Sequence, residues 1–288
     1  MRIAIASGKG GTGKTTIATS LALSLASEYE TWYLDCDVEA PNGHLFLHPN
    51  FADQVPAVIK IPRIQSDICT LCGNCVDVCQ FHALANIVKS IMVFPQLCHG
   101  CGSCTLNCPQ QAIQEVDAPI GKLESGIAMA GIHFQHGMLS ISEPMPTPVI
   151  RQLKRRVDPG KNVVVILDSP PGASCSVVET LRGVDYVLLV TEPTPFGIHD
   201  LYQMLGIVHD MNIPAGMIIN RDGIGEKSMQ SQFAEIPLPV LLRVPFDRRI
   251  ASGIAAGKTL IEIDPKYQQV FSNLYQQIEY QLKVGNIC

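Results

Sequence analysis

The stretch SGKGGTGKTT, residues 7–16, decides how this chain folds. It has the spacing G-x4-G-K-T of a phosphate-binding loop, and it lies between an apolar run at residues 2–6 and a helical pattern at residues 15–25. In such a loop, successive backbone N–H groups point at phosphates and the glycines permit the close approach. We therefore expect a nucleotide with Mg²⁺, with Lys14 on the β- and γ-phosphates and the Thr15 hydroxyl on the metal ion. The predicted nucleotide-binding residues of the loop are Gly8, Lys9, Gly10, Gly11, Thr12, Gly13, Lys14, Thr15 and Thr16.

Further short apolar runs are bounded by turn residues and alternate with helical stretches. They lie at residues 31–35, 163–168, 186–192 and 215–220. This alternation predicts an α/β fold with a mostly parallel sheet and helices on both faces. Near the end, residues 267–282 place apolar side chains at helical spacing, which predicts a packed terminal helix.

The composition excludes several classes of protein. Hydrophobic residues make up 47% of the 288 residues and charged residues 16%, so the chain can bury a sizeable core. The net charge of −5, without a block of like charges, argues against a nucleic-acid-binding surface. No apolar run approaches the roughly 18 residues that span a bilayer, and the start lacks a signal peptide. We expect a cytoplasmic protein with no nucleic-acid partner and no stable membrane insertion.

Cysteine is concentrated in one segment of the chain. Disulfides are rare in the cytoplasm, so eleven cysteines point to metal or redox chemistry. Eight of them lie between residues 62 and 117, in two runs with the same pattern C-x2-C-x2-C-x3-C. Pro109 follows the second run, whereas Gln80 stands at the same place after the first. The first run is Cys69, Cys72, Cys75 and Cys79, and the second is Cys98, Cys101, Cys104 and Cys108.

These two runs have the spacing of iron–sulfur cluster ligands. Three thiolates of one run can hold a [4Fe–4S] cluster from a tight loop, while the fourth, on a short helix, points toward the other cluster. Zinc is the alternative, because paired C-x2-C also binds zinc. His82 and His99 lie beside the runs and are expected outside the ligand sets. The predicted sets are Cys69, Cys72, Cys75 and Cys108 for one cluster, and Cys98, Cys101, Cys104 and Cys79 for the other.

The cysteine-rich segment resembles bacterial two-cluster ferredoxins over about fifty residues. Because the parallel-sheet pattern stops there, we expect an inserted α+β domain at residues 62–117. The nucleotide-binding domain then consists of residues 1–61 and 118–288. Within the second part, residues 118–148 are rich in glycine, proline and methionine, which indicates a hairpin or connecting structure that returns to the sheet.

The loop GKGGTGKTT carries a second lysine, Lys9, which an ordinary phosphate loop does not require. It resembles the deviant phosphate loop of the MinD/ParA/Mrp ATPases, and nearly the whole chain is similar to the subgroup with an inserted ferredoxin domain. The resemblance implies that the nucleotide is ATP and that ATP produces a homodimer. It also implies that Lys9 reaches the phosphates held by the other subunit, so that both Lys9 and Lys14 serve hydrolysis.

Other motifs match the same family in order along the chain. Asp37 in LDCDVEAPN resembles the residue that positions the attacking water, and Asp168 in DSPPG resembles the aspartate associated with Mg²⁺. Asn220 in IINR matches a position that reads the adenine edge. Pro245 and Asp247 in VPFD match a second loop beside the adenine.

Four further residues stay outside the predicted site. Asp35 is interpreted as a buried carboxylate at a strand end. Cys175 has the spacing of a cluster-ligating cysteine in the nitrogenase iron protein, but we favour a small buried thiol. Cys36 is interpreted as a core residue, and Cys288 as a residue without a role.

Three functions are compatible with a nucleotide site fused to cluster ligands. In the first, ATP closes the dimer and controls electron transfer or docking to an unidentified redox or iron–sulfur acceptor protein. The second is an iron–sulfur cluster carrier or assembly ATPase of Mrp type. The third is a positional or scaffolding switch like MinD with structural clusters, which the missing basic membrane-binding tail weakens. We favour the first, because eight ferredoxin-type ligands predict permanent clusters.

Overall fold

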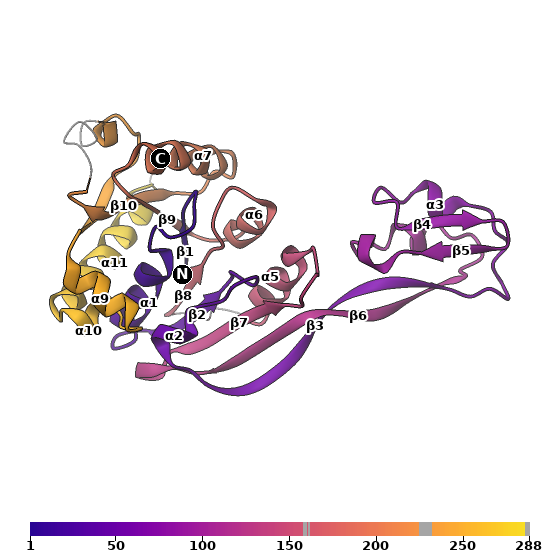
Figure 1. Cartoon of the computed structure of the whole chain (residues 1–288), viewed down its shortest axis with the longest axis horizontal. Helices are drawn as coiled ribbons and strands as arrows, with labels where there is room; N and C mark the ends of the chain where they lie inside the picture. The colour runs from indigo at the N-terminus through magenta and orange to yellow at the C-terminus, as the bar shows by residue number, and fades with distance from the viewer. Residues whose placement is uncertain (158–159, 161, 225–231, 286–288) are drawn as a thin grey trace.

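The computed structural model describes residues 1–157, 160, 162–224 and 232–285, and a large sheet forms its centre (Figure 1). The strands are β1 (Arg2–Ala6), β2 (Glu30–Asp35), β3 (Asn50–Ile64), β4 (Leu84–Ile87), β5 (Ser90–Val93), β6 (Ile113–Ile127), β7 (His133–Leu139), β8 (Val163–Asp168), β9 (Tyr186–Thr191), β10 (Ala215–Asp222) and β11 (Val240–Pro245). The α-helices are α1 (Lys14–Leu25), α2 (His44–Leu47), α3 (Asn74–Asp77), α4 (Ser103–Leu106), α5 (Pro146–Arg155), α6 (Cys175–Leu181), α7 (Pro195–Asp210), α9 (Arg248–Ala255), α10 (Leu260–Ile263) and α11 (Lys266–Gly285). Two short 3₁₀ helices are η1 (Pro95–Leu97) and η2 (Met129–Gly131).

The central sheet has nine strands in the order β11-β10-β9-β1-β8-β2-β7-β6-β3. From β11 to β7 every neighbouring pair is parallel, whereas β6 runs antiparallel to both β7 and β3. The sheet is therefore mostly parallel, as the alternation of apolar runs predicts. The predicted strands appear as β1, β2, β8, β9 and β10, and the predicted terminal helix appears as α11.

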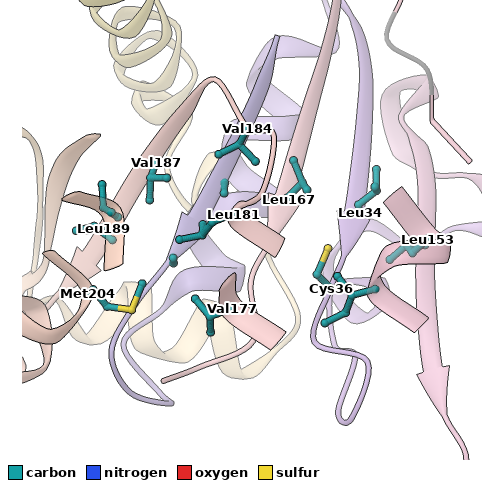
Figure 2. Close-up of a cluster of buried hydrophobic side chains, with 14 of the residues drawn as sticks. Leu34, Cys36, Leu153, Leu167, Val177, Leu181, Val184, Val187, Leu189 and Met204 are labelled. Carbon is teal, nitrogen blue, oxygen red and sulfur yellow. The ribbon is translucent and has the colours of Figure 1, made fainter. Parts of the chain in front are cut away.

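Helices cover both faces of the sheet because successive side chains of its buried strands point to opposite sides. On one face, Ala4 and Ala6 of β1 belong to a core that includes side chains of α5, α6 and α7. On the other face, Ile3 and Ile5 pack with side chains of α1 and α11. Figure 2 shows part of the first core, where Cys36 lies among buried aliphatic residues as predicted.

The antiparallel edge of the sheet extends away from the body as a long hairpin (Figure 1). The pairs between β6 and β7 end at Gly121 and Leu139, but β3 and β6 continue to pair until Ile64 meets Ile113. We call the outer part of this hairpin, residues 58–64 and 113–119, the arm. The predicted domain boundaries at residues 62 and 117 fall inside its two strands.

The arm carries a small unit that contains both cysteine runs, residues 65–112, which we call the cysteine unit (Figure 1). It consists of the antiparallel pair β4–β5, the short helices α3 and α4 and the 3₁₀ helix η1. Its buried side chains form a core of their own, which includes Ala83, Leu84 and Ile91 together with four of the cysteines. After the arm returns, the rest of β6, η2 and β7 form a hairpin within the predicted range of residues 118–148, and the last residues of that range begin α5.

No helix in the described ranges is both long enough and apolar enough to cross a membrane.

Candidate functional site

The phosphate loop joins β1 to α1, and two of its glycines are required by close approaches. Gly13 has a φ of 94°, and a Cβ atom there would lie 2.3 Å from Asn220 Nδ2. At Gly8, a Cβ atom would lie 2.4 Å from the carbonyl oxygen of Asp200. A side chain at either position would therefore displace the loop from β10 or from α7. The tight curve leaves the N–H groups at the start of α1 available to bind an anion.

Lys14 is the first residue of α1, and its ammonium turns back under the loop. Its Nζ donates to Ser7 Oγ at 3.0 Å and to the carbonyl oxygen of Lys9 at 3.4 Å. Burial lowers the pKa of Lys14, while the nearby carboxylates of Asp168 and Asp37 raise it. A buried ammonium held beside the loop is placed to bind the phosphate groups that the loop receives.

Asp168 ends β8 and is fully buried beside the loop. Its Oδ2 accepts a hydrogen bond from the Tyr33 hydroxyl at 2.9 Å, whereas Oδ1 has no hydrogen-bond partner in the described part of the chain. Burial raises its pKa to about 6, despite the nearby hydroxyls of Thr15 and Tyr33 and the ammonium of Lys14. A buried carboxylate oxygen without a partner, close to a threonine hydroxyl, fits the donor set of a Mg²⁺ ion.

Asp37 lies in the loop after β2 and lines the same pocket as Lys14. Burial raises its pKa, and the ammonium of Lys14 lowers it. The loop is held by Asp35, whose carboxylate accepts the N–H groups of Asp37, Asn42 and Gly43 at 3.2, 2.9 and 2.8 Å. Asp35 is fully buried as predicted, and burial raises its pKa well above the usual range. We infer that this buried carboxylate shapes the loop that presents Asp37.

A pocket of about 440 Å³ opens beside the phosphate loop and extends to β10, β11 and α9. The Asn220 amide donates to the carbonyl oxygen of Thr12 at 2.7 Å, which ties β10 to the loop. The Asp247 carboxylate accepts from the Arg249 N–H at 2.7 Å and caps α9. Phe246 is 56% exposed, and its aromatic ring is a candidate contact for a nucleotide base that the sequence analysis missed. The pocket brings together these predicted residues: Gly10, Gly11, Gly13, Lys14, Thr15, Thr16, Asp37, Asn220, Pro245 and Asp247.

Lys9 lies at the outer side of the loop and forms an ion pair with Glu192 of the same chain. The other oxygen of Glu192 accepts from Arg221 Nη1 at 2.9 Å, and Arg221 Nη2 donates to the carbonyl oxygen of Gly11 at 2.9 Å. Glu192 is buried between its two cationic partners. Glu192 follows β9 and Arg221 lies near the end of β10, and neither was predicted from the sequence because only the strand order β10-β9-β1 brings them to the loop.

The cysteine unit places the eight cysteines around two separate pockets. Each pocket is lined by three cysteines of one run and the last cysteine of the other, in the combination that the sequence predicts. No three His, Cys, Asp or Glu side chains of the described residues are close enough together to hold one metal ion. One pocket is lined by Cys69, Cys72, Cys75 and Cys108, and the other by Cys98, Cys101, Cys104 and Cys79.

An internal repeat explains this arrangement. Each residue of the first run has its counterpart 29 positions later, as Cys69 has Cys98. The helices α3 and α4 both begin after a glycine with positive φ, 86° at Gly73 and 75° at Gly102. The N–H of Ala83 donates to Cys79 Sγ at 3.3 Å, and the repeat-related N–H of Ala112 donates to Cys108 Sγ at 3.2 Å. The last thiol of each run is thus held by the backbone four residues further on.

The remaining residues singled out in the sequence lie apart from these pockets or at their rim. His99 stacks on Phe81 with ring centroids 3.7 Å apart, and both line the second cysteine pocket. His82 is exposed in the turn after the first run. Cys175 is exposed at the start of α6, which differs from the expected buried thiol, because the loop before α6 leaves the first turn open to solvent. Cys288 lies outside the described residues.

A mostly parallel sheet, a phosphate loop after its first strand and a buried aspartate at the neighbouring strand end define a nucleotide-binding protein of the P-loop class. The sequence profile of the CobQ/CobB/MinD/ParA nucleotide-binding domain family matches residues 3–261. The chain therefore belongs to this family, and it is an ATPase of the MinD/ParA type.

Individual relatives resemble the chain over nearly its whole length. An uncharacterised protein of Methanocaldococcus jannaschii, MJ0578, is 30% identical over 279 residues, which cover 97% of this chain and 96% of the relative. The iron–sulfur cluster carrier protein of Methanococcus maripaludis is 21% identical over 299 residues, which cover 98% and 85%. Among solved structures, the septum site-determining protein MinD of Pyrococcus horikoshii, complexed with Mg-ADP, has a TM-score of 0.58 at 18% identity and coverages of 96% and 95%. This last likeness shows the shared fold.

Proposed function

We propose that this ATPase uses the nucleotide state of a dimer to control electron transfer or docking through two [4Fe–4S] clusters in the cysteine unit. One observation carries the proposal. Two sets of four cysteines line two separate pockets, and the arm joins them to the sheet that bears the phosphate loop. A nucleotide site alone needs no cluster ligands, and a simple ferredoxin needs no nucleotide. Their presence in one chain favours a coupled function.

The chemistry of the cysteine pockets supports cluster binding. Thiolates are the usual ligands of [4Fe–4S] clusters, and backbone N–H groups that point at ligand sulfurs help to set their reduction potentials. Ala83 and Ala112 supply such donors to Cys79 and Cys108. When bound, the clusters would supply one-electron chemistry. In this proposal residues 62–117 act as a ferredoxin-like domain, with Cys69, Cys72, Cys75 and Cys108 holding one cluster and Cys98, Cys101, Cys104 and Cys79 the other.

The nucleotide pocket supports the assignment of ATP and Mg²⁺. Lys14 and Thr15 line this pocket and are proposed to bind the phosphates and the metal ion, and Asp168, whose Oδ1 has no partner among the described residues, is proposed to bind the metal ion with Thr15. Asp37 faces the same pocket and is proposed to position the attacking water. Lys9 lies at the outer side of the loop, so it is proposed to serve the phosphates of a second copy of the chain.

A cluster carrier is the second candidate, because a relative at 21% identity is named an iron–sulfur cluster carrier protein. This function requires that a cluster can leave the protein. Four cysteines instead line each of two pockets, and if all of them are cluster ligands, as we propose, the clusters should stay bound.

Redox titration of the anaerobically purified protein separates these candidates. For the first function, we expect the potential of at least one cluster to differ between protein with Mg-ATP analogue and protein with Mg-ADP. For the carrier, we expect unchanged potentials and movement of iron and sulfide to an apo-ferredoxin. The Asp37→Ala variant should bind ATP but hydrolyse it slowly, so its cluster spectrum should keep the ATP-dependent change that the wild-type protein shows only during turnover. Reduction potentials and cluster spectra that are the same with Mg-ATP analogue and with Mg-ADP would contradict the proposal.

A further inference from the structure

The arm is held to the body of the molecule by α5, which also binds the helix that follows Asp168. We propose that α5 is the coupling element through which the nucleotide pocket controls the cysteine unit, with Gln152 and Lys154 as its two contacts. This inference rests on the proposed function. It adds a path from the nucleotide pocket to the cysteine unit that does not run along the two chain connections of the unit.

The first contact joins α5 to α6. The Lys154 ammonium donates to three main-chain carbonyl oxygens at the end of α6, those of Glu179, Thr180 and Arg182, at 2.6, 2.8 and 2.6 Å. These carbonyls lack partners within a helix, so a cation there stabilises the helix end. Burial lowers the pKa of Lys154. Arg151 also forms a bidentate ion pair with the Glu179 carboxylate, with N–O distances of 3.1 and 3.0 Å.

This contact reaches the nucleotide pocket through the chain itself. Asp168 ends β8, and α6 begins seven residues later at Cys175. Between them, Ser169 and Pro171 line the nucleotide pocket. A nucleotide that binds two arrangements of this segment with different affinity therefore also favours one position of α6. Because α5 is bound to the end of α6, its position follows.

The second contact joins α5 to the arm. The Gln152 side-chain amide pairs with the backbone of Val58, accepting from its N–H at 3.1 Å and donating to its carbonyl oxygen at 2.9 Å. β3 is the edge strand, and the N–H and carbonyl groups of Val58 point away from β6. The Gln152 amide therefore makes the two hydrogen bonds that a neighbouring strand would otherwise make. One turn further, Arg156 pairs with Asp53 of the same strand at 2.5 Å.

The contact between Gln152 and Val58 lies where a small movement of α5 would have the largest effect on the arm. The register between β3 and β6 shifts between Ala57 and Val58, at the point where the arm begins. Such an irregularity bends a strand and weakens the local ladder, so it is a natural pivot. Gln152 holds the first residue beyond the pivot, and Figure 1 shows α5 beside the hairpin between the sheet and the cysteine unit. A small shift of α5 would therefore turn the arm about Ala57.

The test removes one contact at a time and measures hydrogen exchange. In the full-length wild-type protein, we expect exchange in residues 65–112 to differ between a non-hydrolysable ATP analogue with Mg²⁺ and ADP with Mg²⁺. Gln152→Met keeps the length of the side chain but removes both hydrogen bonds to Val58, together with a hydrogen bond to the carbonyl oxygen of Pro148 within α5. It should abolish the difference in residues 65–112. In the wild-type protein we also expect a difference in residues 169–174, which border the nucleotide pocket, and Gln152→Met should leave that difference and the kcat of ATP hydrolysis unchanged. Arg155→Met, on an exposed neighbour in the same helix, is the matched control and should behave like wild type.

A second variant tests whether the contacts act in series. Lys154→Met should also abolish the difference in residues 65–112, and the double variant should lose no more than either single variant, because a series needs both contacts. Thermal melting of each variant identifies a general loss of folding. A nucleotide-dependent difference that survives in Gln152→Met overturns the role of α5 but leaves the proposed function intact. If wild-type protein shows no difference in residues 65–112, both are overturned.

Discussion

The Lys9 ammonium and the Glu192 carboxylate form an ion pair within one subunit, at the outer side of the phosphate loop. Arg221 binds the other oxygen of the same carboxylate at 2.9 Å. If Lys9 serves the phosphates of a second subunit, its ammonium must exchange part of this contact for phosphate oxygens. Glu192 and the neighbouring phosphates then compete for one cation.

Glu192→Gln tests this competition. The Lys9 side chain is 31% exposed, so the pair contributes at most about 1 kcal/mol, and its removal should lower the ATP-analogue concentration for half-maximal dimerisation by up to about fivefold. Sedimentation velocity at increasing analogue concentration measures this midpoint. Asp117→Asn, which breaks the exposed pair with Lys60 on the arm, is the control and should leave the midpoint unchanged. A higher midpoint in Glu192→Gln would mean that the carboxylate positions Lys9 for its partner instead of competing.

The two lysines of the loop should fail in different ways. Lys14→Ala removes the buried ammonium that is proposed to bind the phosphates in the loop of its own subunit. The change should reduce ATP affinity by at least about tenfold. Lys9→Ala should keep ATP binding but lose ATP-dependent dimerisation and most hydrolysis. Isothermal titration with ATP and sedimentation with the non-hydrolysable analogue separate the two effects. Normal dimerisation of the Lys9 variant would refute its proposed role in the second subunit.

The raised pKa of Asp168 predicts that Mg²⁺ binding depends on pH. Its folded-state pKa of about 6 lies above the unfolded value of about 3.9, so folding disfavours the charged form. Without Mg²⁺, the contribution of Asp168 to the free energy of unfolding should fall by up to about 3 kcal/mol as the pH rises from about 4 to 6. With Mg-ADP the trend reverses, because the metal ion needs the ionised carboxylate.

Thermal melting between pH 5 and 8 checks this prediction. The stabilisation by Mg-ADP over ADP with EDTA should decrease as the pH falls below about 6. Asp168→Asn should lose this stabilisation at every pH. A Mg²⁺ effect that is independent of pH in the wild-type protein would contradict the assignment of Asp168 to the metal ion.

Iron and sulfide analysis tests the two cysteine pockets. Anaerobic protein should contain about eight iron and eight sulfide per chain, as two four-iron clusters require. Cys108→Ser should damage the cluster held mainly by the first run, because Cys108 lines the pocket of Cys69, Cys72 and Cys75. Cys175→Ser, which changes an exposed cysteine outside both pockets, is the control and should keep the full iron content. Stoichiometric zinc with little sulfide would refute cluster binding.

Sequence patterns predicted the parts of the molecule that depend on local spacing. The buried strands, the phosphate loop and the two cysteine sets follow from apolar runs and short repeats, so each could be predicted from neighbouring residues. The arm could not, because β3 contains Pro56 and Pro62 and lacks a continuous apolar run. The contacts of Glu192, Arg221 and Gln152 join segments distant in sequence, and only the strand order determines which of these segments meet.

β3 is the outermost strand of the sheet, and its outer edge has α5 beside it around Val58 but no further strand, which bears on whether separate molecules aggregate. A long strand with one unpaired side can add the edge of another copy and start an aggregate. In this strand, Pro56 and Pro62 interrupt the row of N–H donors, and Asp53, Lys60 and Arg63 bring charge to it. The prolines that prevented the prediction of this strand from the sequence thus also disfavour pairing between the hairpins of separate molecules. Replacing both with valine should therefore increase aggregation of the protein through the outer edge of β3.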